Sequence, residues 1–188
     1  TSTGYGIAKY DNPEELSVSD RNNIGYQYTD CPLYWISVIY LNFAEAKAEM
    51  GSLTQDDLNN SINKLQARAG LPAMTTTPDA DPANNMGVSN LIWEIRRCRR
   101  CELIMDNWYR YWDLIRWHQL DKLDSTKYPN TMLGANVSNV PDCEEATKNG
   151  YIDASDAQIR TYEAKHYFYP IPTTQLTLNK NMKQNPGW

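Results

Sequence analysis

One stretch of this sequence, residues 93–103, concentrates the side chains most able to do chemistry. It holds four arginines, and Cys98 and Cys101 are spaced as Cys-x-x-Cys. Clustered guanidinium groups can bind an anion, and a Cys-x-x-Cys pair can be redox-active or supply half of a zinc site. However, Glu102 lies three residues from Arg99, a spacing that pairs charges along a helix, and Glu94 stands in the same segment. We therefore interpret the stretch as a helix with neutralised charges.

The four cysteines give no clear site. Their even number would permit disulfides in an exported protein, but a zinc site would need two more ligands, and His118 and His166 are not in a paired arrangement. A thioredoxin-like motif would open a helix after a strand, and no such strand precedes Cys98. We interpret all four as plain, semi-buried thiols. They are Cys31, Cys98, Cys101 and Cys143.

Other catalytic patterns are missing from the sequence. It has no glycine-rich phosphate loop and no Gly-x-Ser-x-Gly elbow. The adjacent acids Glu14–Glu15 and Glu144–Glu145 lie in polar loops and do not indicate the paired carboxylates of a glycosidase. With 18 basic and 23 acidic residues the net charge is −5, which argues against a nucleic-acid partner. The residues alone favour a non-catalytic helical scaffold.

Composition adds one hint about ligands. The 13 tyrosines and 6 tryptophans far outnumber the 2 phenylalanines, so nearly every aromatic ring carries a polar group. Such rings suit a carbohydrate-facing surface, where one part stacks and another hydrogen-bonds. A loop-rich globule would show the same bias. The length of 188 residues suits one domain or at most two small ones.

Two helices are predicted between residues 34 and 70. The first covers about 34–50, and the second begins at the cap Thr54 and ends before Gly70 and Pro72. A connection of about three residues makes them an antiparallel hairpin. The first helix is expected to bury one apolar stripe and the second another. These stripes are Ile36, Tyr40, Phe43 and Met50, and then Leu58, Ile62, Leu65 and Ala69.

The rest of the chain is expected to be less regular. Ser89 opens a helical stretch over about 90–123, broken near Asp106–Asn107, which gives a second hairpin. Residues 1–33 are predicted to be loop. Residues 124–188 are predicted to form a long loop, with a short helix near 153–161, and then an extended tail. The fold class is therefore mainly α, with hairpins similar in kind to tetratricopeptide units.

Four motifs in this chain resemble the signature of the SusD/RagB family. They are the Arg-rich helix followed by Arg110 to Trp117, the tail from Tyr169 to Trp188, the segment Leu41 to Ala46, and the segment Asn63 to Leu71. Two departures stand out: Cys98 replaces a usual Glu, and the step at 106–109 is one residue longer. The motif residues expected to have structural roles are Arg97, Arg99, Glu102, Arg110, Asp113, Arg116, Trp117, Pro170, Pro172, Asn185 and Pro186.

The resemblance implies a SusD-like α-α superhelix and a cell-surface lipoprotein of the outer membrane in Bacteroidetes-type bacteria. It implies that residues 1–188 are one C-terminal domain, anchored through a lipid on a missing N-terminal region. Such proteins capture a glycan, or in some branches a peptide, for a SusC-like TonB-dependent transporter, as non-enzymatic components of nutrient uptake. No cofactor is implied.

No ligand residue can be carried over from the family to a numbered position. Loops on a rigid scaffold usually carry binding, so Tyr128, Tyr151 and Tyr162 in the 124–165 loop are the candidate ligand-binding residues. Two other functions stay open. A peptide- or protein-binding module would need a wide apolar groove, and a helical glycoside hydrolase would need two convergent carboxylates.

Overall fold

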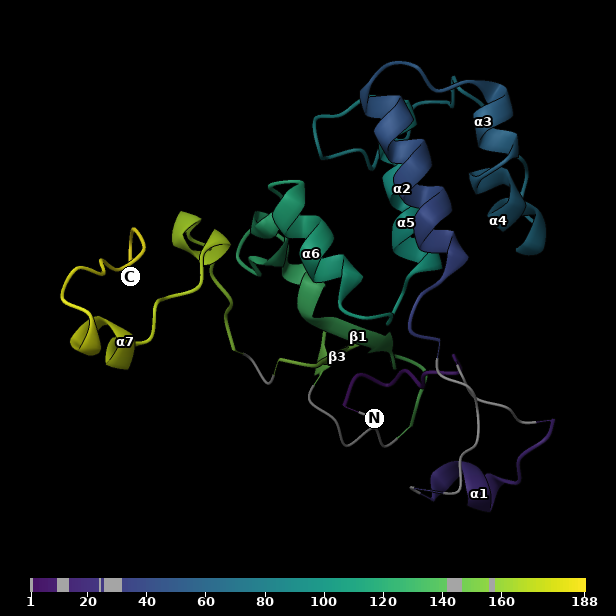
Figure 1. Cartoon of the computed structure of the whole chain (residues 1–188). Coiled ribbons are helices and arrows are strands. Elements are labelled where there is room, and N and C mark those ends of the chain that lie inside the picture. Colours follow the sequence, from purple (N-terminus) through teal and green to yellow (C-terminus); the bar gives the residue numbers. More distant parts are fainter. Residues whose placement is uncertain (1, 10–13, 24, 26–31, 142–146, 156–157) are drawn as a thin grey trace. The chain divides into compact units, whose positions relative to one another are not determined.

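The structure is a computed structural model that describes residues 2–9, 14–23, 25, 32–141, 147–155 and 158–188 (Figure 1). The chain divides into two compact units. We call residues 30–112 the helical unit, and residues 1–29 together with 113–188 the sheet unit. Each unit is considered by itself below.

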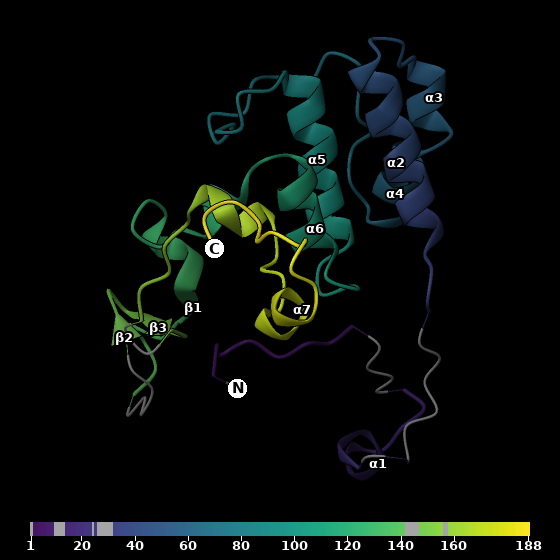
Figure 2. The same ribbon diagram turned by 60° about the vertical axis from the view of Figure 1, so that its left-hand side comes forward.

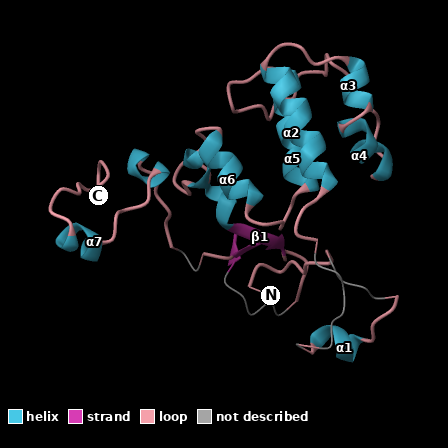
Figure 3. Ribbon diagram, viewed as in Figure 1, coloured by secondary structure: helices cyan, strands magenta, loops and turns pink. Residues whose placement is uncertain are grey.

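The helical unit contains α2 (Ile36–Glu49), α3 (Gln55–Asn59), α4 (Ile62–Arg68) and α5 (Asn90–Glu102), and α6 (Tyr109–Arg116) begins in it. Helix α2 packs side by side with α5 and also contacts α4 (Figures 1 and 3). The predicted break near residues 106–107 is confirmed. No helix in the described residues is both long and apolar enough to cross a membrane.

The core of the helical unit contains the stripe predicted for residues 54–69, except that Ala69 is exposed. That segment forms two helices, because two side chains compete with the backbone at the junction. Ser61 Oγ donates to the carbonyl of Asp57 at 2.6 Å and Asn60 Nδ2 donates to that of Asp56 at 3.0 Å. The core residues are Leu41, Ala44, Leu58, Ile62, Leu65, Met74, Ile95 and Leu103.

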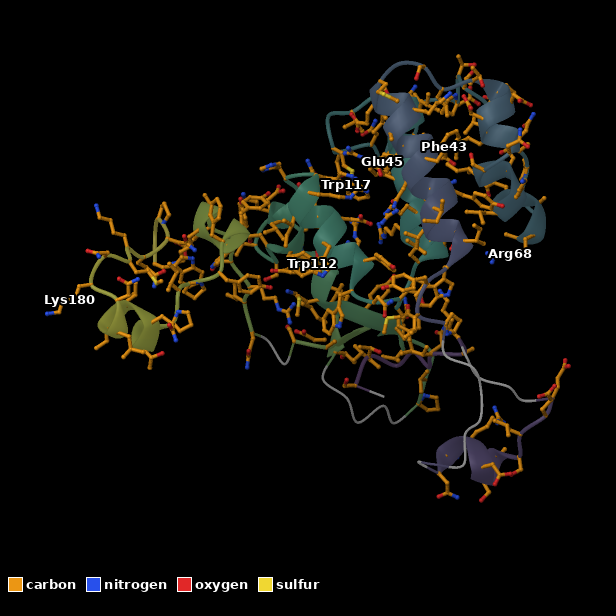
Figure 4. The ribbon with its side chains drawn as sticks, in the orientation of Figure 1. Phe43, Glu45, Arg68, Trp112, Trp117 and Lys180 are labelled. Atoms are coloured by element: carbon orange, nitrogen blue, oxygen red, sulfur yellow. The ribbon has the colours of Figure 1, made fainter. Side chains whose placement is uncertain are left out.

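The prediction for the buried face of α2 was wrong. Its apolar stripe lies mostly at the surface, where three side chains are between 41% and 69% exposed and Tyr40 is half-buried. The buried face is formed by Ser37, Leu41, Ala44 and Glu45. Figure 4 shows Phe43 and Glu45 on different sides of the helix. The exposed residues of the predicted stripe are Ile36, Phe43 and Met50.

A buried ion pair joins α2 to α5 and accounts for this reversal. Arg96 Nε lies 3.1 Å from Glu45 Oε1, and their side chains are 10% and 5% exposed. Arg96 Nη2 also lies 2.9 Å from Glu49 Oε1, whose side chain is 53% exposed. Charges removed from water must be paired and hydrogen-bonded, so the Glu45 side of α2 has to face Arg96.

A second charged contact ties α2 to α3. Asp57 Oδ2 accepts from the Thr54 backbone N–H at 2.9 Å, while Thr54 Oγ1 accepts from the Asp57 N–H at 3.1 Å, which completes a capping box. Lys47 Nζ lies 3.0 Å from the same carboxylate oxygen. The Thr54 hydrogen bonds, and then Lys47, lower the pKa of Asp57 to about 2.

The sheet unit holds a small antiparallel sheet that the sequence analysis missed. The strands are β1 (Leu133–Asn136), β2 (Thr147–Lys148) and β3 (Tyr151–Asp153), in the order β1-β3-β2 (Figure 2). Asn149 and Gly150 both have positive φ, 53° and 79°, and make the two-residue turn of the β2–β3 hairpin. The helix predicted near 153–161 is absent from the described residues of that range. Asp153 ends strand β3, and the described residues after it form a turn and loop.

The remaining elements of the sheet unit are short. One of them, a five-residue helix, lies in the lead-in that was predicted to be loop, and another lies in the tail that was predicted to be extended. They are α1 (Val18–Asn22), η1 (Leu120–Leu123), η2 (Pro129–Met132), η3 (Ala164–Tyr167) and α7 (Thr173–Leu178).

Residues near the N-terminus lie along β1. The Ala135 N–H donates to the carbonyl of Thr3 at 2.8 Å. A Cβ added to Gly134 would lie 2.3 Å from that same oxygen, so only glycine fits there. A Cβ on Gly4 would meet Ala135 and Ile152, which places the N-terminal residues against one side of the sheet.

Two parts of the C-terminal tail bind each other across α7. Gln184 exchanges two hydrogen bonds with the backbone of Ile171, at 2.8 and 2.9 Å. Asn185 Nδ2 donates to the carbonyl of Tyr169. Trp188 Nε1 donates to the carbonyl of Phe168 at 2.9 Å. The tail is thus closed by its own motif residues. Its prolines, all exposed, are Pro170, Pro172 and Pro186.

We predict that Glu45→Ala lowers the free energy of unfolding by about 3 kcal/mol, because it strips a buried arginine of its buried partner. The matched variant Glu49→Ala removes the exposed carboxylate from the same arginine and should cost less than about 1 kcal/mol. Urea unfolding of both variants measures the difference. Equal losses would show that the pair does not organise the α2–α5 contact.

We also predict a loss of stability in acid that depends on Asp57. Because its pKa is lowered on folding, its contribution is complete above its ordinary value of 3.8 and is lost as the pH falls towards about 2. Asp57→Asn should therefore reduce the free energy of unfolding at pH 7 and weaken its dependence on pH between pH 4 and pH 2. Urea midpoints at several pH values measure this. Asp56→Asn is the control, because it removes a carboxylate from the same helical turn and leaves the Thr54 and Lys47 contacts in place.

Candidate functional site

The sheet unit contains a cavity of about 180 Å³ between the small sheet and the chain around Ser125. Its walls combine hydroxyl, amide and charged groups with a few apolar side chains. Lys148 and Asp153 are its charged residues. The lining residues are Ser125, Thr126, Pro129, Met132, Leu133, Lys148, Asp153, Ser155, Gln158 and Ile159.

Strand register decides which side chains reach this cavity. Side chains alternate along a strand, so Tyr151 and Asp153 share one face of β3 and Ile152 lies on the other. Lys148 pairs directly with Tyr151, and Leu133 with Asp153. Three of these four residues line the cavity; the fourth, Tyr151, lies on the same face of the sheet beside Lys148 but is not part of the lining.

The opposite wall is held by Asp124, a buried carboxylate. It accepts hydrogen bonds from the hydroxyl and backbone N–H of Thr126 and from the N–H of Tyr162. The Thr126 hydroxyl and the Tyr162 N–H, in that order, lower the pKa of Asp124 to about 2. Ser125 and Arg160 add reciprocal hydrogen bonds at 2.9 and 3.0 Å. These hydrogen bonds hold the chain at residues 124–126 to the chain at residues 160–162.

The structure brings Tyr128 and Tyr162 together at Asp124, although neither lines the cavity. The N–H of Tyr128 donates to the Asp124 carbonyl at 2.9 Å. Lys122 Nζ lies 4.5 Å from the centre of the Tyr128 ring and bonds its hydroxyl, and Lys127 Nζ lies 5.9 Å from the ring of Tyr162. One face of each ring is thus occupied by a cation.

Tyr162 is further enclosed by its neighbours. Its ring meets those of Tyr167 and His166 edge-on, at centroid distances of 5.8 and 6.2 Å. Burial, and then a hydrogen bond with Tyr167, raises the pKa of Tyr162 to about 12. Of the three candidate tyrosines, Tyr151 is therefore the best placed to meet a ligand.

Lys148, Asp153 and Gln158 were missed as candidates. The one available signal was Asn149–Gly150, which is typical of a hairpin and would have placed Lys148 opposite Tyr151. The cavity offers hydrogen bonds to a polar ligand. Asp153 is the single carboxylate in its lining, so these described walls lack the acid pair of glycoside hydrolysis.

Arg96, Arg97 and Glu102 of the arginine-rich helix form ion pairs, and three of their partners come from other helices: Glu45 and Glu49 of α2, and Arg68 of α4. Arg97 pairs with Glu94 within α5. Glu102 bonds Arg68 of α4 at 2.6 Å, a contact between helices that local spacing could not reveal. Figure 4 labels Arg68 at the end of α4.

The other motif residues also have structural surroundings. Arg99 Nη1 donates to Asn42 Oδ1 of α2 at 2.8 Å. Arg116 Nε lies 2.9 Å from Asp113 Oδ1, one turn earlier in the same helix. Trp117 is buried, with the Arg116 guanidinium 4.6 Å from its ring centre. Arg110 is half-buried in the first turn of α6.

The two described cysteines differ in their exposure to solvent. Cys98 is half-buried, and burial, followed by the nearby Glu102, raises the pKa of its thiol to about 12, so it is a poor nucleophile. Cys101 is exposed, contrary to the expectation of a semi-buried thiol. Cys31 and Cys143 lie outside the described residues. No group of three or more possible metal ligands occurs in the part of the chain that is described.

Two kinds of comparison with known proteins find matches for this chain. A SusD-like protein from Bacteroides fragilis has a crystal structure that aligns with 81% of the chain, with a TM-score of 0.52 and 25% sequence identity. The alignment covers 25% of that protein, so the chain spans about a quarter of its length. No curated protein sequence matches. The sequence model of the SusD family matches residues 1–188. The chain belongs to the SusD family.

Proposed function

We propose that this chain is part of a non-catalytic binding protein that captures a glycan for nutrient uptake. The observation that carries the proposal is the match of the SusD family over all 188 residues. On this proposal the whole protein is a surface-exposed, lipid-anchored component of the outer membrane. It hands its ligand to a SusC-like TonB-dependent transporter.

The cavity in the sheet unit supports a sugar as the ligand. Three hydroxyl side chains, an amide, a carboxylate and an ammonium group line it, and these groups match the many hydroxyls of a sugar. The exposed ring of Tyr151 lies on the same face of the sheet, beside Lys148 of the lining, where a pyranose could stack. A volume of about 180 Å³ is smaller than the roughly 300–1,000 Å³ of drug-sized sites. It therefore suits one sugar residue of a longer chain.

We predict that Tyr151→Ala weakens glycan binding about tenfold, the equivalent of ~1.4 kcal/mol, because it removes the stacking ring. The measurement is affinity gel electrophoresis of the full-length protein in native gels. The gels would contain starch, inulin, xyloglucan, arabinoxylan, polygalacturonan or gastric mucin. The polysaccharide that retards the wild type is then used for the variants.

Tyr5→Ala is the matched control, since Tyr5 is an exposed tyrosine that follows Gly4, and Gly4 lies against Ile152 on the other face of the sheet. If Tyr151→Ala binds glycan as tightly as the wild type does, the cavity is not part of the glycan-binding site. Glycan capture itself would still stand. No retardation of the wild type by any polysaccharide would contradict glycan capture and favour a peptide ligand.

A further inference from the structure

Most polar side chains in the wall of the sheet-unit cavity already have partners within the chain. The Ser125 hydroxyl donates to the carbonyl of Arg160 at 3.3 Å and accepts the N–H of the same residue at 3.0 Å. The Thr126 hydroxyl donates to the carboxylate of Asp124. Because a hydroxyl has one proton to donate, these two hydroxyls can only accept hydrogen bonds from a ligand.

The turn that follows β3 is bonded in the same way. The hydroxyl and the N–H of Ser155 both donate to Asp153 Oδ1, at 2.6 and 3.0 Å. Ser155 therefore also has no hydroxyl proton left for a ligand, and the carboxylate that lines the cavity accepts two hydrogen bonds from its own turn.

Two other polar side chains of the lining lack such partners. In the described part of the chain, neither the Lys148 ammonium group nor the Gln158 side-chain amide forms a hydrogen bond or an ion pair. Lys148 pairs with Tyr151 and shares a sheet face with Asp153, yet these two charges do not bond each other. The hydrogen-bond donors left for a ligand are thus the N–H groups of one cation and one amide.

These donors favour a ligand group that is negatively charged and rich in acceptors. A carboxylate only accepts hydrogen bonds, and a bond between an ammonium group and a carboxylate is roughly twice as strong as one between neutral groups. The cavity suits a single sugar residue, so an acid group on that residue lies close to both donors. The apolar lining residues Met132, Leu133 and Ile159 suit the C–H face of the sugar ring.

We propose that the cavity binds a uronic acid residue, with its carboxylate held by Lys148 and Gln158, and that the captured glycan is therefore an acidic one. This inference rests on the proposed function and names the class of sugar for the same cavity. The negative charge of Asp153 directs the carboxylate of the sugar towards Lys148. The sugar hydroxyls then donate to the hydroxyl oxygens of the opposite wall.

The test is isothermal titration calorimetry of the full-length protein with oligomers of galacturonate, alginate and hyaluronan. Each acidic oligomer is compared with its methyl ester, which keeps the sugar and removes the charge. At least one acid should bind, and its ester should bind about tenfold more weakly, the equivalent of ~1.4 kcal/mol. Sodium chloride at ~0.5 M should weaken binding of the acid more than binding of the ester.

Variants then assign the charge preference to the cavity. Lys148→Met should weaken binding of the preferred acid about tenfold and leave binding of its ester within about twofold, whereas Lys148→Arg should bind the acid nearly as well as the wild type. Gln158→Glu adds a like charge and should weaken binding of the acid by a similar factor. The matched control is Lys180→Met, because Lys180 is an exposed lysine and none of the described residues 160–188 lines the cavity.

Because the Lys148 side chain has no partner, Lys148→Met should unfold at the same urea concentration as the wild type, so a loss of binding would not reflect a loss of folding. Wild-type affinity of Lys148→Met for the acid would overturn the inference. So would equal binding of acid and ester, or binding of neutral glycans alone, and in these cases glycan capture would stand. A wild type that binds neither these oligomers nor any polysaccharide in the gels would overturn both proposals.

Discussion

The buried ion pair between Arg96 and Glu45 is the interaction on which the helical unit depends. Its two charges lie in a region from which most water is excluded, and each stabilises the other there, with Glu49 as a second carboxylate on Arg96. This requirement fixes the rotation of α2 about its own axis, and with it the side of the helix that meets α5. As a consequence, the apolar side chains on the other side of α2 face away from α5.

The sequence predicted the helices better than their packing. Caps such as Thr54 and Ser89, and the stripe at Leu58, Ile62 and Leu65, act locally, and the structure confirms them. The face that α2 buries was predicted wrongly, because hydrophobic periodicity cannot register a core contact made by two charges from distant parts of the chain.

The candidate site was only partly predictable for a similar reason. Tyr151 could be named from its type and its loop, but its neighbours could not. Lys148 and Asp153 reach the cavity through strand register, which depends on a two-residue turn and on pairing with β1.

The N-terminal residues beside β1 have a consequence for how the molecule behaves in solution. An uncovered strand edge presents free backbone N–H and C=O groups, and it readily recruits a strand from another molecule. The carbonyl of Thr3 occupies the N–H of Ala135, and the glycine at 134 lets the segment approach closely. Displacement of the segment around Thr3 from β1 would therefore expose this edge and promote edge-to-edge association and aggregation, even with the sheet itself intact.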